Sequence, residues 1–376
     1  MQFNCSDWRF SSKLLTESQM LALFGSLYGC VGISSFLGNT VILVTIFWVA
    51  EMRTATNLFI ANLAASDLLI TVSSLWITPL YSIQQQWNYG LLPCKLWNGI
   101  TTVGVVVSSF SLMSIAIDRY FQILHPFSSK RKSKLTLAAV FGIIWLGGVL
   151  AALPLVIYTD LVTIHSACTS TYVSFCVDHF RPKEIRVLYG LSILLLKTVV
   201  PFSMIAYCYR MVTLRLRSQC IRVCDRRSSA GRLRTIRRRQ KLHRILIAMV
   251  ILYGVCSTPL DLINLIKDID WYLSSIRLFD GEFKYPLSLA CHLLAMTALL
   301  WNPLLYAFLN ENFKREYKRF CSCGNGQRIS RLSGFVARFT VTTNDQSFHY
   351  RSSLRKISSK KPYTAYGTMQ DPETLI

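Results

Sequence analysis

Asp118-Arg119-Tyr120 and Asn302-Pro303-Leu304-Leu305-Tyr306 are the two stretches that decide how this chain folds. The first closes an apolar segment over residues 92–123, and the second closes another over residues 284–308. Charged side chains and kinking prolines are costly in lipid, so their presence at the ends of two apolar segments indicates a function there. The two stretches together predict a membrane protein with functional polar residues at the ends of its spans.

The composition supports a chain that crosses the membrane several times. Of the 376 residues, 52% are apolar and 16% are charged, and the mean hydropathy is positive. The apolar runs are long enough to cross a hydrocarbon core of about 30 Å as helices. Residues 1–19 lack the basic start and apolar stretch of a cleavable signal peptide, so we expect the first span to act as its own insertion signal. The predicted spans cover residues 20–49, 57–83, 92–123, 135–158, 187–216, 236–269 and 284–308.

The formal net charge of +22 is concentrated between and after the spans. Residues 210–244 contain thirteen Lys or Arg against one acidic residue, Asp225, and residues 309–376 contain twelve against five. These segments and the basic loop 125–134 fall on one side of the membrane if the spans alternate. Because basic loops stay in the cytoplasm, the charge predicts an extracellular N-terminus and a cytoplasmic tail. It therefore indicates membrane orientation rather than binding to nucleic acid.

We expect an all-α membrane protein, a seven-transmembrane helix bundle with a short eighth helix and a disordered tail. Phe313, Tyr317 and Phe320 recur at helical spacing among basic residues, which is typical of an amphipathic helix that lies on the membrane surface. The tail has no sustained apolar period and is rich in Ser and Thr. The predicted parts are the N-terminus (1–19), the bundle (20–308), the amphipathic helix (309–323) and the tail (324–376).

Short motifs outside the spans predict modification and partner binding. Asn4, in Asn4-Cys5-Ser6, is an acceptor for N-glycosylation. Cys321 and Cys323 follow the amphipathic helix and are candidates for palmitoylation, with structural thiols as the alternative. The terminal Thr374-Leu375-Ile376 resembles a PDZ-domain ligand, and phosphorylation of tail serines such as Ser352 would recruit arrestin.

In this order, the two stretches quoted first resemble those of the rhodopsin-like (class A) G-protein-coupled receptor family, and the resemblance covers about residues 20–323. The succession of Trp87-Asn88-Tyr89-Gly90, Cys94 and Cys176 is similar to that of the peptide-receptor members. The resemblance implies a disulfide between Cys94 and Cys176, on the oxidising side of the membrane where such a bond persists. A second bridge stays open among Cys5, Cys168 and Cys291.

The resemblance also implies a polar cluster in the bundle, made by Asn39, Asp67, Ser108 and Asn302. In the family this cluster binds sodium and rearranges on activation. An unpaired Asp at mid-membrane would cost several kcal/mol, so Asp67 needs a partner. Two interpretations stay open: a sodium ion held by Asp67, Ser108 and Asn302, or a protonated Asp67 that bonds to Asn302.

Signal transmission is expected at the cytoplasmic end, by resemblance to the family. Asp118 would hold the guanidinium of Arg119 in the inactive state. When the sixth span swings out, Arg119 would turn toward the G protein, with Tyr209 and Tyr306 as hydroxyl partners. Arg suits this role because its five fixed donors can exchange partners between two states. Tyr120 completes the motif.

Prolines within the spans remove backbone donors and bend their helices, and Pro259 and Pro303 are the expected pivots of the activation swing. The chain departs from the family in the sixth span, where Cys256-Ser257-Thr258-Pro259 has Ser in place of the usual Trp. Trp301, directly before Asn302, is a candidate to fill the space of the missing indole.

The pocket is expected to accept neither an amine nor retinal. Thr101 stands where amine receptors carry an Asp, and Met296 stands where light-sensing members carry the Lys of the Schiff base. Lys197 and Asp261 both fall inside the membrane, where a lone charge is costly, so we predict an ion pair between the fifth and sixth spans. Separate bonds of each to other nearby groups are the alternative.

Several residues resemble those of the neuropeptide Y and RFamide receptor branch. Thr78, Asn264, Asp268 and His292 match residues with which that branch holds an amidated peptide C-terminus and its neighbouring Arg. The Asp268 carboxylate would accept a bidentate bond from Arg, and a solvated cap formed with Asp270 is the alternative. The candidate ligand-binding residues are therefore Thr78, Thr101, Lys197, Asp261, Asn264, Asp268 and His292.

The resemblance implies a plasma-membrane receptor for a C-terminally amidated neuropeptide, coupled to a heterotrimeric G protein of the inhibitory type. A tachykinin-like receptor and a constitutively active orphan receptor are the alternatives within the class. A transporter or channel is disfavoured because the chain lacks the internal repeats that transporters tend to show. No paired catalytic set is found, so an enzyme is not expected, and apart from sodium no cofactor is expected.

Overall fold

The computed structural model describes residues 17–84, 86–125, 133–166, 171–225, 230–273 and 284–309. The chain divides into two units, Met1–Tyr317 and Lys318–Ile376, and every described residue belongs to the first. The glycosylation motif, the predicted eighth helix, Cys321, Cys323 and the tail with its PDZ-like end lie outside the described residues.

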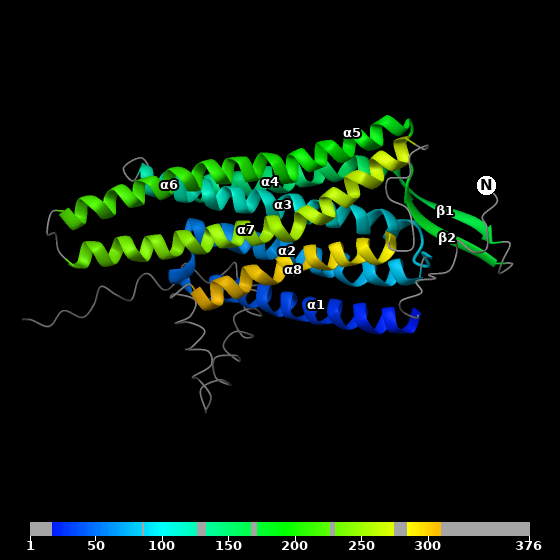
Figure 1. Ribbon diagram of the computed structural model, residues 1–376, viewed down its shortest axis with the longest axis horizontal. Helices are drawn as coiled ribbons and strands as arrows, with labels where there is room; N and C mark the ends of the chain where they lie inside the picture. Colours follow the sequence, from blue (N-terminus) through cyan, green and yellow to red (C-terminus); the bar gives the residue numbers. More distant parts are fainter. Residues whose placement is uncertain are drawn as a thin grey trace, which may run out of the picture. The chain divides into compact units, whose positions relative to one another are not determined.

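Within the described residues, seven helical spans are long and apolar enough to cross a membrane (Figure 1). The predicted seven-span bundle is thus confirmed. The fifth span consists of α5, the π turn η3 and α6, so the sixth span is α7 and the seventh is α8. The helical elements are α1 (Glu17–Trp48), η2 (Ala50–Met52), α2 (Ala55–Gln84), α3 (Leu91–Leu124), α4 (Lys134–Tyr158), α5 (Lys183–Leu194), η3 (Leu195–Val199), α6 (Val200–Asp225), α7 (Ala230–Leu273) and α8 (Lys284–Leu309).

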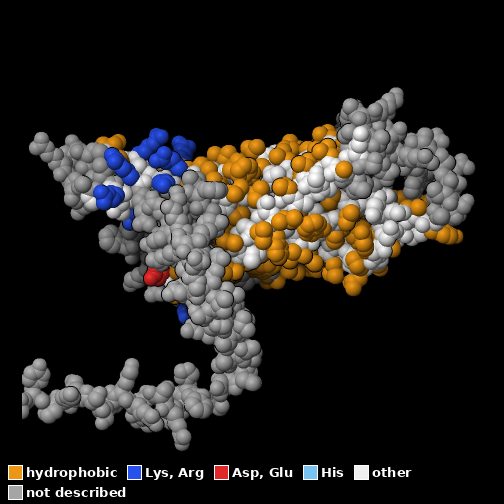
Figure 2. Space-filling view, turned by 90° about the horizontal axis from the view of Figure 1, so that it is seen from below, with side chains coloured by type: hydrophobic (Ala, Val, Ile, Leu, Met, Phe, Trp, Pro, Cys, Tyr) orange, Lys and Arg blue, Asp and Glu red, His pale blue; other side chains and the backbone are white. Residues whose placement is uncertain are grey.

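The helices of the fifth and sixth spans run further than the apolar segments predicted for them. α6 ends at Asp225 rather than at residue 216, and α7 begins at Ala230 rather than at residue 236. Arg, Lys and Gln are strong helix formers, so the helices continue after the apolar residues end. Lys and Arg side chains form a basic patch at one end of an apolar belt (Figure 2). We call this the basic end, after exposed residues such as Arg237 and Arg239.

The opposite end carries a β-hairpin, and we call it the hairpin end (Figure 1). Strands β1 (Thr159–Ser166) and β2 (Thr171–Asp178) pair antiparallel, with Val162 opposite Phe175 and Asp160 opposite Val177. No strand was expected between the predicted spans 135–158 and 187–216. The density of β-branched and aromatic residues in both strands was the available signal.

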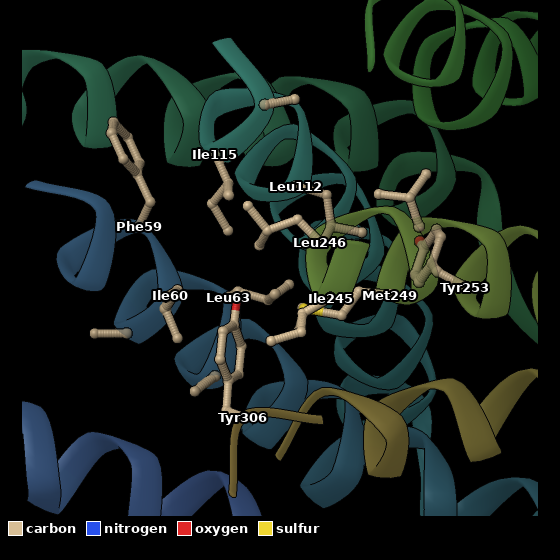
Figure 3. Packing of buried hydrophobic residues seen from close by; sticks show 14 of the residues in the cluster. Phe59, Ile60, Leu63, Leu112, Ile115, Ile245, Leu246, Met249, Tyr253 and Tyr306 are labelled. Carbon is tan, nitrogen blue, oxygen red and sulfur yellow. The ribbon is translucent and has the colours of Figure 1, made fainter. Parts of the chain in front are cut away.

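A buried cluster between the hairpin end and the basic end holds α2, α3, α7 and α8 together (Figure 3). Leu63, Leu112, Met249 and Tyr306 come from these four helices, and each is at most 3% exposed. In lipid, apolar burial between helices gains little from water release, so close packing and polar contacts stabilise the bundle. Gly104 permits one such approach, because a Cβ there would lie 2.6 Å from a side-chain carbon of Ile70.

Candidate functional site

A cavity of about 1130 Å³ opens at the hairpin end. Helices α2, α3, α5, α7 and α8, the turn η3 and the hairpin all contribute to its wall, including Val162 and Phe175 from the two strands. Ligand pockets for small molecules are about 300–1,000 Å³, so this one has room for the end of a peptide. All seven candidate ligand-binding residues line it: Thr78, Thr101, Lys197, Asp261, Asn264, Asp268 and His292.

An ion pair joins the fifth and sixth spans in the wall of this cavity. Lys197 Nζ donates to Asp261 Oδ1, and Thr198 Oγ1 donates to Asp261 Oδ2 at 2.9 Å. The predicted ion pair is therefore confirmed. Lys197 and Thr198 both lie in η3, where the wider π turn lets two consecutive residues reach one carboxylate. The Asp261 side chain is 4% exposed and that of Lys197 is 19% exposed, so the two charges are largely removed from solvent.

A second group of charged residues in the cavity wall joins three elements, α5, α7 and β2. Arg186 of α5 donates through Nε to Asp268 Oδ1 of α7 at 2.9 Å and through a terminal nitrogen to Asp178 at the end of β2. Asp268 is only 8% exposed, which contradicts the alternative of a solvated cap with Asp270. Arg186 was not among the predicted site residues. The one signal for it in the sequence was a basic residue at the start of a span with acidic residues nearby.

A chain of hydrogen bonds fixes His292 against α1 and α2. Its Nδ1 lies 2.8 Å from the hydroxyl of Tyr28, which donates to the backbone oxygen of Leu289 at 3.0 Å. Its Nε2 lies 3.1 Å from Ser74 Oγ, which in turn lies 3.0 Å from Thr78 Oγ1. With both ring nitrogens engaged, the imidazole is held in one orientation. Two of the candidate ligand-binding residues therefore belong to one preorganised network.

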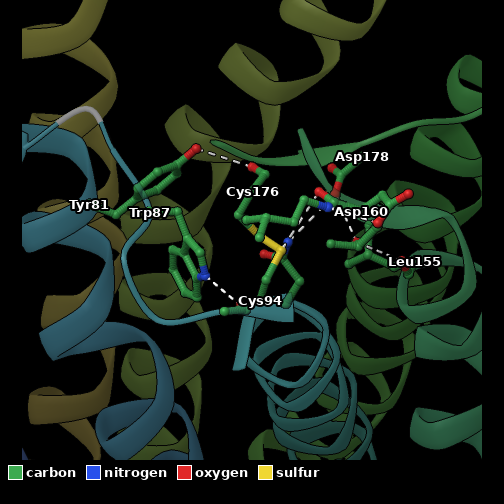
Figure 4. Close-up of a disulfide and its surroundings, with 11 residues drawn as sticks. Tyr81, Trp87, Cys94, Leu155, Asp160, Cys176 and Asp178 are labelled. Atoms are coloured by element: carbon green, nitrogen blue, oxygen red, sulfur yellow. Dashed lines mark hydrogen bonds between the residues drawn. A yellow bond between two sulfur atoms is a disulfide. The ribbon is translucent and has the colours of Figure 1, made fainter. Parts of the chain in front are cut away.

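The hairpin is fastened to α3 by a disulfide between Cys94 and Cys176, as expected from the resemblance (Figure 4). The buried Trp87 donates from Nε1 to the oxygen of Gly90 at 2.7 Å and from its backbone nitrogen to the hairpin at Ser174. Gly90 has a φ of 80°, a conformation that glycine adopts at least cost. These contacts hold the hairpin against the cavity. Among the described cysteines Cys291 is free, and Cys5 and Cys168 lie outside the described residues.

At the basic end, Asp118 is 2% exposed and accepts hydrogen bonds from two of the described residues. One comes from Thr56 at 2.6 Å and the other from Gln122 at 2.7 Å, and Arg119 donates to the side-chain oxygen of Gln122 at 3.3 Å. Neither Thr56 nor Gln122 was among the predicted site residues. The predicted direct hold of the Arg119 guanidinium by Asp118 is not seen among the ion pairs of the described residues, and Gln122 connects the two residues of the motif instead.

Residues of the fifth and sixth spans lie near Arg119. His243 of α7 lines a small cavity with it, and the ring of Tyr209 packs edge-on against that imidazole with centroids 5.1 Å apart. Tyr306 is 2% exposed in the buried cluster described above. The residues expected to transmit a signal therefore gather at the end of the bundle opposite the large cavity.

Three of the four residues of the predicted polar cluster are joined by hydrogen bonds. Asp67 is fully buried, and its two carboxylate oxygens accept from Asn302 at 2.8 Å and from Ser108 at 3.1 Å. Asn39 donates to the backbone oxygen of Leu299, and its own side-chain oxygen is buried without a hydrogen-bond partner among the described residues. A carboxylate, a hydroxyl and an unpartnered amide oxygen are ligands that suit a hard cation such as sodium.

The space left by the missing indole is not filled by Trp301, which is 37% exposed on the outside of the bundle. The suggestion that it replaces the indole is therefore wrong, because Trp301 points away from the interior. Phe202 instead stacks on Tyr253 with ring centroids 6.0 Å apart, and Tyr253 lies 2.9 Å from Ser109 through its hydroxyl. These aromatic rings join the fifth and sixth spans below the ion pair.

Comparison of the sequence with known proteins shows which family and which receptors it is similar to. The family described as "7 transmembrane receptor (rhodopsin family)" matches residues 38–306. The neuropeptide Y receptor type 6 of Oryctolagus cuniculus is 31% identical over 323 residues, which cover 83% of this chain and 84% of that protein. The type 6 receptor of Mus musculus is 32% identical, with 80% and 81% covered. The neuropeptide F receptor of Drosophila melanogaster is 28% identical, with 84% and 66% covered.

Proposed function

Because this chain belongs to the rhodopsin family of seven-transmembrane receptors, we propose that it is a receptor for a neuropeptide that signals through a heterotrimeric G protein. It is a multi-pass membrane protein and a receptor rather than an enzyme. The relatives named for neuropeptide Y and neuropeptide F support a peptide of that kind. An amidated C-terminus is the further part of the proposal that rests on the resemblance of Thr78, Asn264, Asp268 and His292.

The observation that carries the proposal is the composition of the large cavity. Its charges are balanced, with three acids and three bases, and polar side chains stand between them. Such a wall suits a peptide end that presents both a charge and an amide, because each needs a hydrogen-bonding partner when it leaves water. The charged residues of the wall are Asp178, Asp261, Asp268, Arg186, Lys197 and Lys267.

The orientation follows from the two ends of the bundle. The hairpin end carries the Cys94–Cys176 disulfide, which persists in an oxidising compartment. The basic end carries the Lys and Arg residues that stay in the cytoplasm. The cavity thus opens to the extracellular side of the plasma membrane, and the N-terminus is extracellular.

Helix α7 connects the cavity to the basic end. Asp261 lines the cavity two residues after Pro259, and His243 of the same helix lines the small cavity beside Arg119. A peptide that binds more tightly when α7 has swung outward would shift a pre-existing equilibrium toward that state. Pro259 and Pro303 serve as pivots, and Arg119 and Tyr120 face the G protein. Arrestin, a PDZ protein, N-glycosylation and palmitoylation are further proposals that rest on residues outside the described ones.

A G-protein activation assay in cells tests this proposal. Cells that express the chain would be exposed to peptides ending in Arg-Phe-amide or Arg-Tyr-amide, with inhibition of cyclic AMP as the readout for an inhibitory G protein. We expect a dose-dependent response that Arg119→Ala abolishes and that the exposed control Arg210→Ala retains.

Surface expression of all three proteins has to be equal for the comparison to count. A response that survives Arg119→Ala would contradict the assigned role of that residue. Silence toward every peptide, at normal surface expression, would contradict the proposed ligand class. High basal signal without peptide would favour a constitutively active receptor instead.

A further inference from the structure

The bridge formed by Arg186 places a guanidinium of the chain itself between two carboxylates in the cavity. Asp178 and Asp268 come from β2 and α7, and Arg186 reaches both from α5. The side chains of Arg186 and Asp178 are 25% and 23% exposed, so the bridge is accessible from the cavity. The Lys197–Asp261 pair lies deeper, with a carboxylate side chain only 4% exposed.

One of the two carboxylates, that of Asp178, is also held by residues outside the bridge. Asp178 Oδ1 accepts from Thr159 at 3.0 Å and from Asn98 at 3.5 Å, which leaves Oδ2 for the guanidinium. Asp268 uses Oδ1 for Arg186 and lies with Oδ2 against Gly190 of α5. A side chain at residue 190 would collide with that oxygen, so the glycine keeps the space beside the carboxylate open. Asp178 therefore keeps contacts that do not involve Arg186, and the glycine leaves room beside Asp268.

The guanidinium of Arg186 makes one further contact besides those with the two carboxylates. It lies over the ring of Phe180, with 5.4 Å between its carbon and the ring centroid. Such a cation–π contact remains available when hydrogen bonds to carboxylates are given up. Leaving the bridge consequently costs less for Arg186 than it would for a fully enclosed cation.

We propose that Arg186 is an internal occupant of a guanidinium site, and that an Arg side chain of the peptide ligand binds between Asp178 and Asp268 by displacing it. The inference rests on the proposed function as a peptide receptor and names what controls its selectivity. Arg186 determines which ligands can bind at this site. A ligand must carry a planar, charged group that competes with the guanidinium of Arg186 for the two carboxylates. A peptide without such a group leaves the bridge closed.

The quantitative consequence is opposite to that of an ordinary binding residue. An internal occupant lowers the apparent affinity by the fraction of time during which the site is free. Its removal also leaves two neighbouring carboxylates without the cation that bridges them, and a ligand guanidinium then takes its place. Arg186→Gln should accordingly bind an Arg-containing peptide about tenfold more tightly, and tenfold corresponds to about 1.4 kcal/mol.

Equilibrium binding to the full-length receptor in membranes tests the exchange. The probes are a fluorescent peptide ending in Arg-Phe-amide and the same peptide with citrulline, which keeps the shape of Arg without its charge. We expect Arg186→Gln to gain about tenfold for the Arg peptide and less than twofold for the citrulline peptide. The matched control is Lys183→Gln, which removes one positive charge from the same helix one turn earlier and should change binding of either peptide less than twofold.

The double variant Arg186→Gln with Asp268→Asn separates exchange from a general change in the pocket. The selective gain should disappear in it, because one of the two carboxylates has lost its charge. Three results would each overturn the exchange and indicate that the bridge has only a structural role. They are weaker binding of the Arg peptide to Arg186→Gln, equal changes for both peptides, and a gain that survives Asp268→Asn. No saturable binding of either peptide to the wild-type receptor would overturn the proposed ligand class, and the exchange with it.

Discussion

Removal of Lys197 should be among the most destabilising single changes in the wall of the cavity. Lys197→Met leaves the carboxylate of Asp261 with a side chain only 4% exposed and with Thr198 as the remaining donor described for it. Loss of one partner from a buried ion pair costs about 3–5 kcal/mol, because the other charge stays buried without compensation. At roughly 2 °C per kcal/mol for a large domain, the melting temperature should fall by about 6–10 °C.

The assay is thermal unfolding of the purified receptor in detergent, followed at one fixed heating rate because membrane proteins unfold irreversibly under such conditions. Lys183→Met is the control, since Lys183 lies on the adjoining helix at an exposed place and its loss should shift the melting temperature by less than about 2 °C.

A compensating change tests whether loss of the ion pair itself lowers the melting temperature. Replacing both partners, Lys197→Met with Asp261→Leu, removes the stranded charge, and replacing buried pairs by apolar residues is often neutral. The double variant should therefore melt well above the single one. The reasoning is refuted if Lys197→Met melts within 2 °C of the wild type, or if the second substitution lowers the melting temperature further.

Two more changes follow from the contacts described above. Cys176→Ser opens the bridge to Cys94 and should lower the free energy of unfolding by about 2–4 kcal/mol; a melting temperature equal to that of the wild type would contradict it. If the polar cluster holds sodium, replacing choline by sodium in the buffer should raise the wild-type melting temperature through ligand binding to the folded state. Asp67→Asn should abolish this effect, and a sodium-dependent shift that persists in the variant would exclude Asp67 as the ligand.

Much of the candidate site could be predicted because its residues carry strong local signals. Lys197 and Asp261 are charges within apolar spans, so each had to find a partner, and the family resemblance placed them on facing helices. Arg186 gave no comparable signal, since an Arg at the start of a span can reach solvent. Its role depends on Asp178, which the hairpin brings to the cavity and which lies eight residues away along the chain.

The assignment of Trp301 failed for a related reason. Whether a residue of a span faces the interior depends on the rotation of that helix about its axis, and neighbouring residues differ in direction by about 100°. Asn302 points inward to Asp67 while Trp301 faces outward. Because Asn302 faces the interior, the residue directly before it was to be expected to face away from the interior.

The sequence by itself determined the seven spans, the basic end and the residue types available at each end. Transfer of a segment into lipid depends on the summed contributions of its own residues, and that sum can be read locally. The tertiary structure decided which partners meet: Thr56 with Asp118, Arg186 with Asp268, and the hairpin with the cavity. Those choices depend on the rotation and packing of helices far apart in the chain, because a hydrogen bond or ion pair needs its atoms within about 3 Å of each other.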